Sequence, residues 1–165
     1  MSATARLGLP LLSAGQAQKE LVHNEALQVI DMLLATAVEA PPDAAPPAAP
    51  VLGATYIVAA SPSGAWAGKA QCLACYTAGG WRFITARDGM IAYVRSSAVW
   101  AAFRAGAWEL GTLRGSSLVV GGQQVVGPRG GAIAGPSGGA TIDSEVRTAV
   151  TQILAALRQH GLVDS

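Results

Sequence analysis

Apolar side chains recur at helical spacing in the first quarter of the chain. From residue 22 onward they fall three or four positions apart, which places them on one face of a helix: Val22, Ala26, Ile30, Leu33 and Ala37. Ser13 is a suitable N-cap residue, and Pro41 cannot continue a helix. The pattern predicts a helix over residues 13–39. It also predicts an extended arm over residues 1–12, since Pro10 disfavours helix just before it.

The predicted N-terminal helix carries a polar ridge on another face. Amide and carboxylate side chains stand four positions apart in it, at Gln16, Glu20 and Asn24, with Gln18 close by. A helix with one packing face and one hydrogen-bonding face suits an assembly interface better than an active site. We therefore expect Gln16, Gln18, Glu20 and Asn24 to lie in a contact between subunits.

The middle of the chain follows a different pattern. A Pro/Ala-rich segment, residues 41–50, predicts a semi-rigid spacer. Residues 51–113 then alternate short β-branched and aromatic runs with Gly turns, which predicts antiparallel hairpins. Residues 76–83 resemble residues 103–110, because each has an aromatic strand end, a tight Ala-Gly turn and a Trp that opens the return strand. We expect a small β module in which two similar hairpins form a barrel or a sandwich.

The last third of the chain is predicted to hold a Gly-rich connector and a helix. The connector spans residues 114–140, with a hairpin over Gly121-Gly122. Within residues 141–165, Asp143 or Ser144 caps a helix and Gly161 ends it. The apolar stripe of this helix consists of Val146, Val150, Ile153, Leu154 and Leu157. We expect Val146, Val150, Ile153 and Leu157 to form a second part of the assembly interface.

The composition supports assembly. The chain is 51% hydrophobic and 13% charged, whereas about 25% of the residues of typical globular domains are charged. Other copies or a partner would cover part of so apolar a surface. The alternative is that abundant Ala and Gly raise the count without forming apolar patches.

The charge balance and the targeting patterns of the sequence indicate which partners and which cellular location to expect. The 11 basic and 10 acidic residues nearly balance, so we expect neither a nucleic-acid partner nor an anionic membrane surface. The sequence shows no secretion signal and no run long enough to insert in a membrane. These patterns are typical of a protein made and assembled in the cytoplasm, and a virion protein released by lysis would show them too.

Residues that carry chemistry are scarce. Cys72 and Cys75 form a lone C-x-x-C on a predicted strand, where their side chains point to opposite faces, and we interpret both as small apolar side chains. His23 and His160 have no partners at ligand spacing. Phosphate-binding glycine motifs are absent from the sequence. We therefore predict no enzyme, no catalytic residue, no metal and no cofactor.

The tryptophans and tyrosines of the β module allow a second hypothesis. Aromatic faces stack on sugar rings, although hairpin aromatics more often pair across strands and form a core. Trp66 lies in a loop rich in Gly and Ala and is the candidate we expect to be exposed. The alternative function is therefore a carbohydrate-binding module that contacts a host surface or capsular polysaccharide through Trp66.

Several separated motifs occur in an order that resembles one known family. They are residues 9–20, 56–58, 64–68, 79–81, 124–129, 143–147 and 153–162. The chain resembles a domain family of unknown function found in prophages and gene transfer agents of alphaproteobacteria, in proteins assigned to tail fibres or head spikes. The resemblance implies a virion component and implies no catalytic residue.

The sequence as a whole predicts an α+β protein. Its elements are an N-terminal helix, a small antiparallel β module, a Gly-rich connector and a C-terminal helix. We expect a homo-oligomeric head-spike base or fibre adaptor of a phage-like particle, with the arm docked on another virion protein such as capsid or spike fibre. A head vertex would impose five copies and a fibre three, and five is the number we favour.

Overall fold

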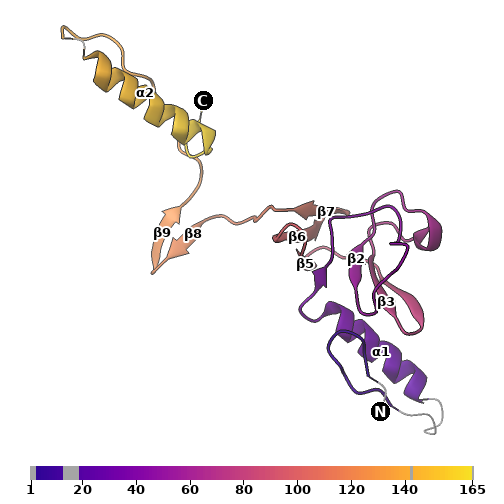
Figure 1. Ribbon diagram of the computed structural model, residues 1–165. Coiled ribbons are helices and arrows are strands. Elements are labelled where there is room, and N and C mark those ends of the chain that lie inside the picture. The colour runs from indigo at the N-terminus through magenta and orange to yellow at the C-terminus, as the bar shows by residue number, and fades with distance from the viewer. Residues whose placement is uncertain (1–2, 13–18, 142, 165) are drawn as a thin grey trace. The chain divides into compact units, whose positions relative to one another are not determined.

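The structure, a computed structural model, describes residues 3–12, 19–141 and 143–164. It divides into two compact units, Met1–Leu113 and Arg114–Ser165, which we describe separately. The first unit (indigo to brown-rose in Figure 1) contains one helix, one 3-10 turn and seven strands within the described residues. They are α1 (Lys19–Leu33), β1 (Ala37–Val38), β2 (Thr55–Ile57), the 3-10 turn (Gly64–Trp66), β3 (Leu73–Thr77), β4 (Gly80–Ile84), β5 (Ile91–Val94), β6 (Val99–Arg104) and β7 (Ala107–Leu110).

The second unit has β8 (Leu118–Val120), β9 (Gln123–Val126) and α2 (Ser144–Gln159). Two helices with short strands in small sheets make an α+β fold, so the predicted fold class is confirmed.

The N-terminal helix ends earlier than the pattern predicts. We expected helix as far as residue 39, but α1 ends at Leu33. Ala35 adopts a left-handed conformation with a φ of 47°, which stops the helix. Val38 then lies fully buried in β1, which pairs in parallel with β5. Burying Val38 in a sheet outweighs the helical pattern that includes its neighbour Ala37. The expected helix start, residues 13–18, lies outside the described residues.

The Pro/Ala segment packs against the β module instead of acting as a spacer. The backbone N–H of Asp43 donates to the Ile57 carbonyl at 3.1 Å, and the N–H of Ala59 donates to the Asp43 carbonyl at 2.7 Å. A third bond runs from the Ser63 N–H to the Ala44 carbonyl at 2.7 Å. The segment thus adds a short parallel bridge beside β2, because its non-proline backbone groups find partners there.

Two sheets share one hydrophobic core. One sheet has the strand order β1-β5-β6-β7, and the other has the order β2-β3-β4. The main cluster of buried side chains draws on strands of both sheets: Val38, Ile57, Leu73, Ala86, Ala92, Val94, Ala101, Phe103 and Trp108. A second cluster lies around Trp66. These clusters account for the folding of the β module as a unit.

The internal repeat corresponds to two hairpins of matching register. Tyr76 lies opposite Trp81 across the β3–β4 turn, and their ring centroids are 5.1 Å apart. Phe103 lies opposite Trp108 across the β6–β7 turn, with ring centroids 5.4 Å apart. Each hairpin is therefore closed by a cross-strand aromatic pair, as the sequence repeat predicted.

The second unit contains the predicted hairpin and helix. β8 and β9 pair antiparallel on either side of Gly121 and Gly122. The Asp143 carboxylate caps α2 by accepting the Val146 N–H at 2.9 Å. Gly161, at a φ of 69°, ends it. Among the described residues of this unit, Leu154 is the buried hydrophobic side chain.

Candidate functional site

The arm before α1 is fastened to that helix by a buried carboxylate. Asp31 is 1% exposed and lies in the last turn of α1. It accepts the Thr4 hydroxyl at 2.8 Å, the Arg6 N–H at 3.0 Å and the Leu7 N–H at 2.6 Å. These three bonds satisfy the carboxylate and hold the arm in place beside the helix.

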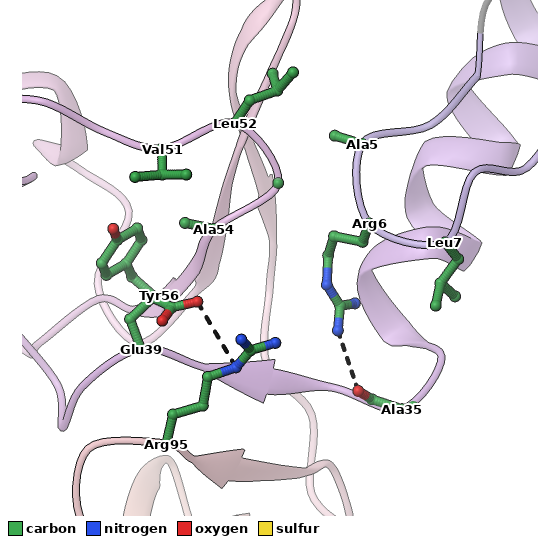
Figure 2. A pocket seen from close by; sticks show the side chains of 11 residues that line it. Ala5, Arg6, Leu7, Ala35, Glu39, Val51, Leu52, Ala54, Tyr56 and Arg95 are labelled. Carbon is green, nitrogen blue, oxygen red and sulfur yellow. Dashed lines mark hydrogen bonds and ion pairs between the residues drawn. The ribbon is translucent and has the colours of Figure 1, made fainter.

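The Arg6 side chain reinforces the same junction. Its guanidinium donates to the carbonyls of Asp31, Met32 and Ala35, the last at 3.1 Å (Figure 2). A cation is stabilising at a helix C-terminus, where carbonyls lack intrahelical partners. The described residues of the arm bind their own helix, and docking of the arm on a neighbouring protein stays a prediction. Sequence reasoning missed this junction, although Asp31 within an apolar run was a signal for it.

One residue of the polar ridge of α1, Asn24, binds within the chain. The Asn24 amide accepts the Leu12 N–H at 2.9 Å and donates to the Leu12 carbonyl at 3.0 Å, which fastens the arm a second time. Glu20 is partly buried, and one of its carboxylate oxygens is buried without a partner among the described residues. Gln16 and Gln18 lie outside the described residues. Asn24, which is half-buried, therefore holds the arm, and a role of the ridge in a contact between subunits stays a prediction.

Much of the exposed surface of α1 is apolar, although His23 and Glu25 are exposed as well. Val22 is 77% exposed, although the pattern placed it on the packing stripe. The large apolar side chains that α1 and its end leave exposed are Leu21, Val22, Val29, Ile30, Leu33 and Leu34. Helices of globular proteins bury such a stripe, so this face is available for contact with another protein.

A shallow cavity extends this apolar face onto the sheet. It has a volume of about 440 Å³, and Leu33, Ile91 and Trp100 contribute to its lining. Trp100 is 48% exposed, and its ring lies 5.4 Å from the ring of Tyr93, another lining residue. The helix end and the sheet together present an aromatic and aliphatic surface.

A larger and more polar pocket lies between the arm and the loop before β2. It has a volume of about 690 Å³, and Figure 2 shows Arg95 directed toward Glu39, with a nitrogen–oxygen distance of 3.8 Å. Burial and the negative charge of Glu39 raise the pKa of Tyr56, so its hydroxyl stays protonated at neutral pH. Gly53 permits the close approach of loop and arm, since a Cβ there would lie 2.9 Å from the Ala5 carbonyl oxygen. The pocket offers hydrogen-bonding groups without a nucleophile.

Trp66 is buried, so the expectation that it is an exposed sugar contact is wrong. Its exposed fraction is 0%, and its ring lies 5.7 Å from that of Tyr56 and 5.3 Å from that of Trp81. The loop that carries it folds into a 3-10 turn that places the indole in the core. Burial of so large an apolar ring outweighs the loop character of its sequence.

The two cysteines are free and buried. Burial, the largest influence, raises the pKa of the Cys75 thiol, and Asp31 adds to the effect, while Thr55 and Arg6 oppose it. A thiol with a raised pKa is a poor nucleophile. This agrees with the interpretation of Cys75 as a small apolar side chain.

The remaining titratable groups form surface pairs and caps. Glu25 pairs with Arg82 at 3.0 Å, which connects α1 to β4. His23 is exposed and His160 is the C-cap residue of α2. Across residues 3–12, 19–141 and 143–164, no three His, Cys, Asp or Glu side chains gather as metal ligands. No described helix is both long and apolar enough to cross a membrane.

The second unit presents the other predicted interface. Along α2, Val146, Val150, Ile153 and Leu157 fall four, three and four positions apart, which is the spacing of a coiled-coil seam. Val146 and Ile153 are 56% and 59% exposed. Leu154 instead is the side chain that packs within the unit. The four predicted residues thus lie at coiled-coil spacing along α2, with Val146 and Ile153 exposed and Val150 and Leu157 half-buried.

A family comparison covers the first unit. Residues 23–109, just over half of the chain, match the family described as "Protein of unknown function (DUF2793)". The chain belongs to this family. The matched residues run from α1 to β7, so the β8–β9 hairpin and α2 lie beyond them. No curated protein and no solved structure matches the chain.

Proposed function

We propose that this DUF2793 protein is a structural component of a phage-like particle such as a gene transfer agent. In this proposal it forms a homo-oligomeric head-spike base or fibre adaptor, assembled in the bacterial cytoplasm and carried in the virion. The motifs that resemble prophage and gene-transfer-agent proteins support the assignment to a phage-like particle. The apolar row along α2, residues Val146, Val150, Ile153 and Leu157, supports the homo-oligomer.

The seam is the observation that carries the proposal. A row of apolar residues with a mean spacing of 3.5 is complementary to another helix of the same pattern, because each side chain fits between four of its partner. Val146, Val150, Ile153 and Leu157 have this spacing. Val146 and Ile153 are more than half exposed, and Val150 and Leu157 are half-buried. Copies of α2 are the simplest partners for such a surface.

The second unit needs such partners for its stability. Its described residues bury one large apolar side chain, Leu154, while Leu118, Val119, Val120, Val125, Val126, Val146 and Ile153 stay exposed. A unit of this size gains little from so small a core. Association would supply the missing burial.

The apolar face of α1 would then meet a second virion protein. This face and the adjoining cavity beside Trp100 combine aliphatic and aromatic side chains without a charged residue among the cavity lining. Depletion of charge with aromatic enrichment is typical of interface cores. Capsid at a head vertex would impose five copies, which we favour over the three of a fibre.

Light scattering of the purified chain at two concentrations tests the oligomer. We expect a constant mass corresponding to five copies, or to three if the chain belongs to a fibre. Ile153→Asp should give a monomer, because it places a charge in the seam without touching the Leu154 contact. Gln152→Asp is the matched control on an exposed neighbouring position and should leave the mass unchanged. A monomer at both concentrations would contradict the proposal.

A carbohydrate-binding function is the second candidate, and Trp100 favours it. Its half-exposed ring, beside Tyr93 at a cavity of about 440 Å³, offers a stacking face that the buried Trp66 does not. The test is binding to an array of capsular and surface polysaccharides. Trp100→Ala should abolish a true signal, and Leu113→Ala, which truncates an equally apolar exposed side chain, should preserve it. Loss with both variants, or with neither, would count against a site at Trp100.

A further inference from the structure

The β8–β9 hairpin forms a two-stranded sheet of its own. Its two strands form a separate sheet, and within the described residues neither strand has a second neighbour. Every residue of both strands is exposed. Gly121 and Gly122 both have positive φ, at 57° and 79°, which a tight type I′ turn requires. The turn thus suits a two-residue hairpin, whose register is regular beside the turn and shifts between Val119 and Leu118.

An isolated hairpin of this length is only marginally stable in water. Hairpins that persist have a hydrophobic face packed on something or a third strand beside them. Here β8 consists of Leu118, Val119 and Val120, and β9 consists of two glutamines followed by two valines. The hairpin makes no core, since Leu118, Val119 and Val120 are each more than half exposed. Its order has to come from outside the single chain.

The edges of the hairpin lack charges and proline. Proteins block free strand edges with charges, Pro, a β-bulge or a covering element, and the one irregularity in this hairpin lies between Leu118 and Val119, away from the turn. The sequence from Gly115 to Gly127 contains neither a charged residue nor a proline. An edge of this kind is open to another strand.

We propose that β8 and β9 pair edge to edge with the same strands of neighbouring copies, so that the hairpins close into one intermolecular sheet. This inference rests on the proposed homo-oligomer and names a second contact within it. The occupant is a second copy for two reasons. The hairpin belongs to the same compact unit as the α2 seam, so copies gathered by the seam bring identical hairpins together. A ring of copies also pairs both edges of every hairpin, and leaves no free edge.

The register identifies the groups that would make these bonds. Val120 lies opposite Gln123 next to the two-residue turn, and Val119 lies opposite Gln124. Opposed residues alternate between those that exchange both hydrogen bonds and those that exchange none, and the pair beside a two-residue turn is of the first kind. The N–H and C=O groups of Val119 and Gln124 therefore point outward, to the neighbouring copies.

Hydrogen–deuterium exchange resolved to single amides tests the contact in the full-length chain. The unaltered chain is compared with its Ile153→Asp variant at a concentration at which light scattering shows that the unaltered chain is an oligomer. We expect the amides of Val119 and Gln124 to be protected in the oligomer and to exchange freely in the monomeric variant. An oligomer in which both amides exchange as fast as in the monomer would overturn the inference and leave the proposed function standing. A chain that is monomeric throughout would overturn both.

A proline substitution gives an independent readout. Gln124→Pro removes an outward donor and keeps the bonds inside the hairpin, because Pro is tolerated on a strand edge. It should raise the concentration at which the oligomer dissociates about tenfold, as one lost hydrogen bond per copy implies. Ser116→Pro, in the loop before β8, is the matched control and should dissociate as the unaltered chain does. Equal dissociation of Gln124→Pro and the unaltered chain would overturn the inference.

Discussion

Three hairpins of this chain share a two-residue turn, yet their surroundings differ. The β3–β4 and β6–β7 hairpins each carry a cross-strand aromatic pair and contribute buried side chains to the shared core. The β8–β9 hairpin carries valine and glutamine instead, and all of its strand residues are exposed. The turn alone therefore does not distinguish a hairpin that packs on the core of its chain from one whose strand residues are all exposed. The aromatic pairs make that difference, because they supply the burial that a short hairpin lacks.

The same contrast holds for the two units. In the first unit, Asp31, Arg6 and Asn24 bind the arm to α1, and the sheets enclose a core. In the second, the described residues bury one large apolar side chain, Leu154. The first unit thus has a core of its own, whereas the small core of the second unit is the reason for which we propose that copies associate there.

Trp66→Ala should have the largest effect on the first unit. Removing a fully buried indole at the centre of an aromatic cluster should lower the free energy of unfolding by about 3–5 kcal/mol. Denaturant unfolding followed by near-ultraviolet circular dichroism measures it. Trp100→Ala removes a half-exposed indole and should cost less than about 1 kcal/mol. Equal losses for the two variants would contradict the placement of Trp66 in the core.

Asp31→Ala should release the arm. The Thr4 hydroxyl and the N–H groups of Arg6 and Leu7 lose their acceptor, which should cost about 2–3 kcal/mol. Trypsin cleavage after Arg6 should become faster, as mass spectrometry of the digest would show. Asp88→Ala, at an exposed turn, should leave the cleavage rate unchanged. Unchanged cleavage in Asp31→Ala would mean that the arm is held by other contacts.

Alkaline pH should weaken the first unit through Cys75. Burial raises the pKa of this thiol above its usual 9.0 in the folded state, so the unfolded state ionises first. Stability is then fully present below pH 9.0 and is lost as pH rises through the higher, folded-state pKa. Urea unfolding between pH 8 and 10 should show that the free energy of unfolding falls less steeply with pH in Cys75→Ala than in the unaltered chain. Ionisation of Tyr56, whose pKa is also raised, accounts for part of the fall that remains in the variant. The difference in free energy of unfolding at pH 7, where the thiol is protonated in both states, gives the packing cost of the substitution. The same dependence of this free energy on pH in both proteins would contradict the prediction.

Ala105→Asn should have the smallest effect, and it should stabilise. Ala105 has a φ of 50° in the β6–β7 turn, and Gly106 follows it at 84°. Asn tolerates this conformation better and Asn-Gly is a preferred type I′ pair, so the gain should be about 0.5 kcal/mol by thermal unfolding. Ala78→Asn, in the β3–β4 turn where φ is not positive, should give no gain. A lower melting temperature of Ala105→Asn would show that the left-handed conformation of Ala105 does not reduce the stability of the unaltered protein.

Local patterns were sufficient for much of the fold. The Ala-Gly turns with a following Trp predicted two hairpins, and Gly121-Gly122 predicted a third. The Asp143 cap predicted the start of α2 within a residue. These features depend on neighbours in the chain, such as a capping side chain or a residue that permits positive φ, so the sequence displays them directly.

The candidate site was harder to predict. The four seam residues of α2 were found because their spacing is regular along one helix. The polar ridge was read as an interface, while Asn24 holds the arm and the apolar face of α1 stays exposed. Which face of an amphipathic helix is covered depends on what folds against it. Here the arm folds against α1, and the spacing of residues within the helix does not show that contact.

The sequence by itself determined the order of the elements, the positions of their turns and caps, and the seam of α2, because each depends on interactions within a few residues. The tertiary structure decided where α1 ends, that the Pro/Ala segment lies beside β2, and that Trp66 is buried. It also decided that Asp31 and Arg6 hold the arm. Each of these outcomes depends on partners that are distant along the chain, and burial or hydrogen bonding with such partners outweighs the local preference that the sequence displays.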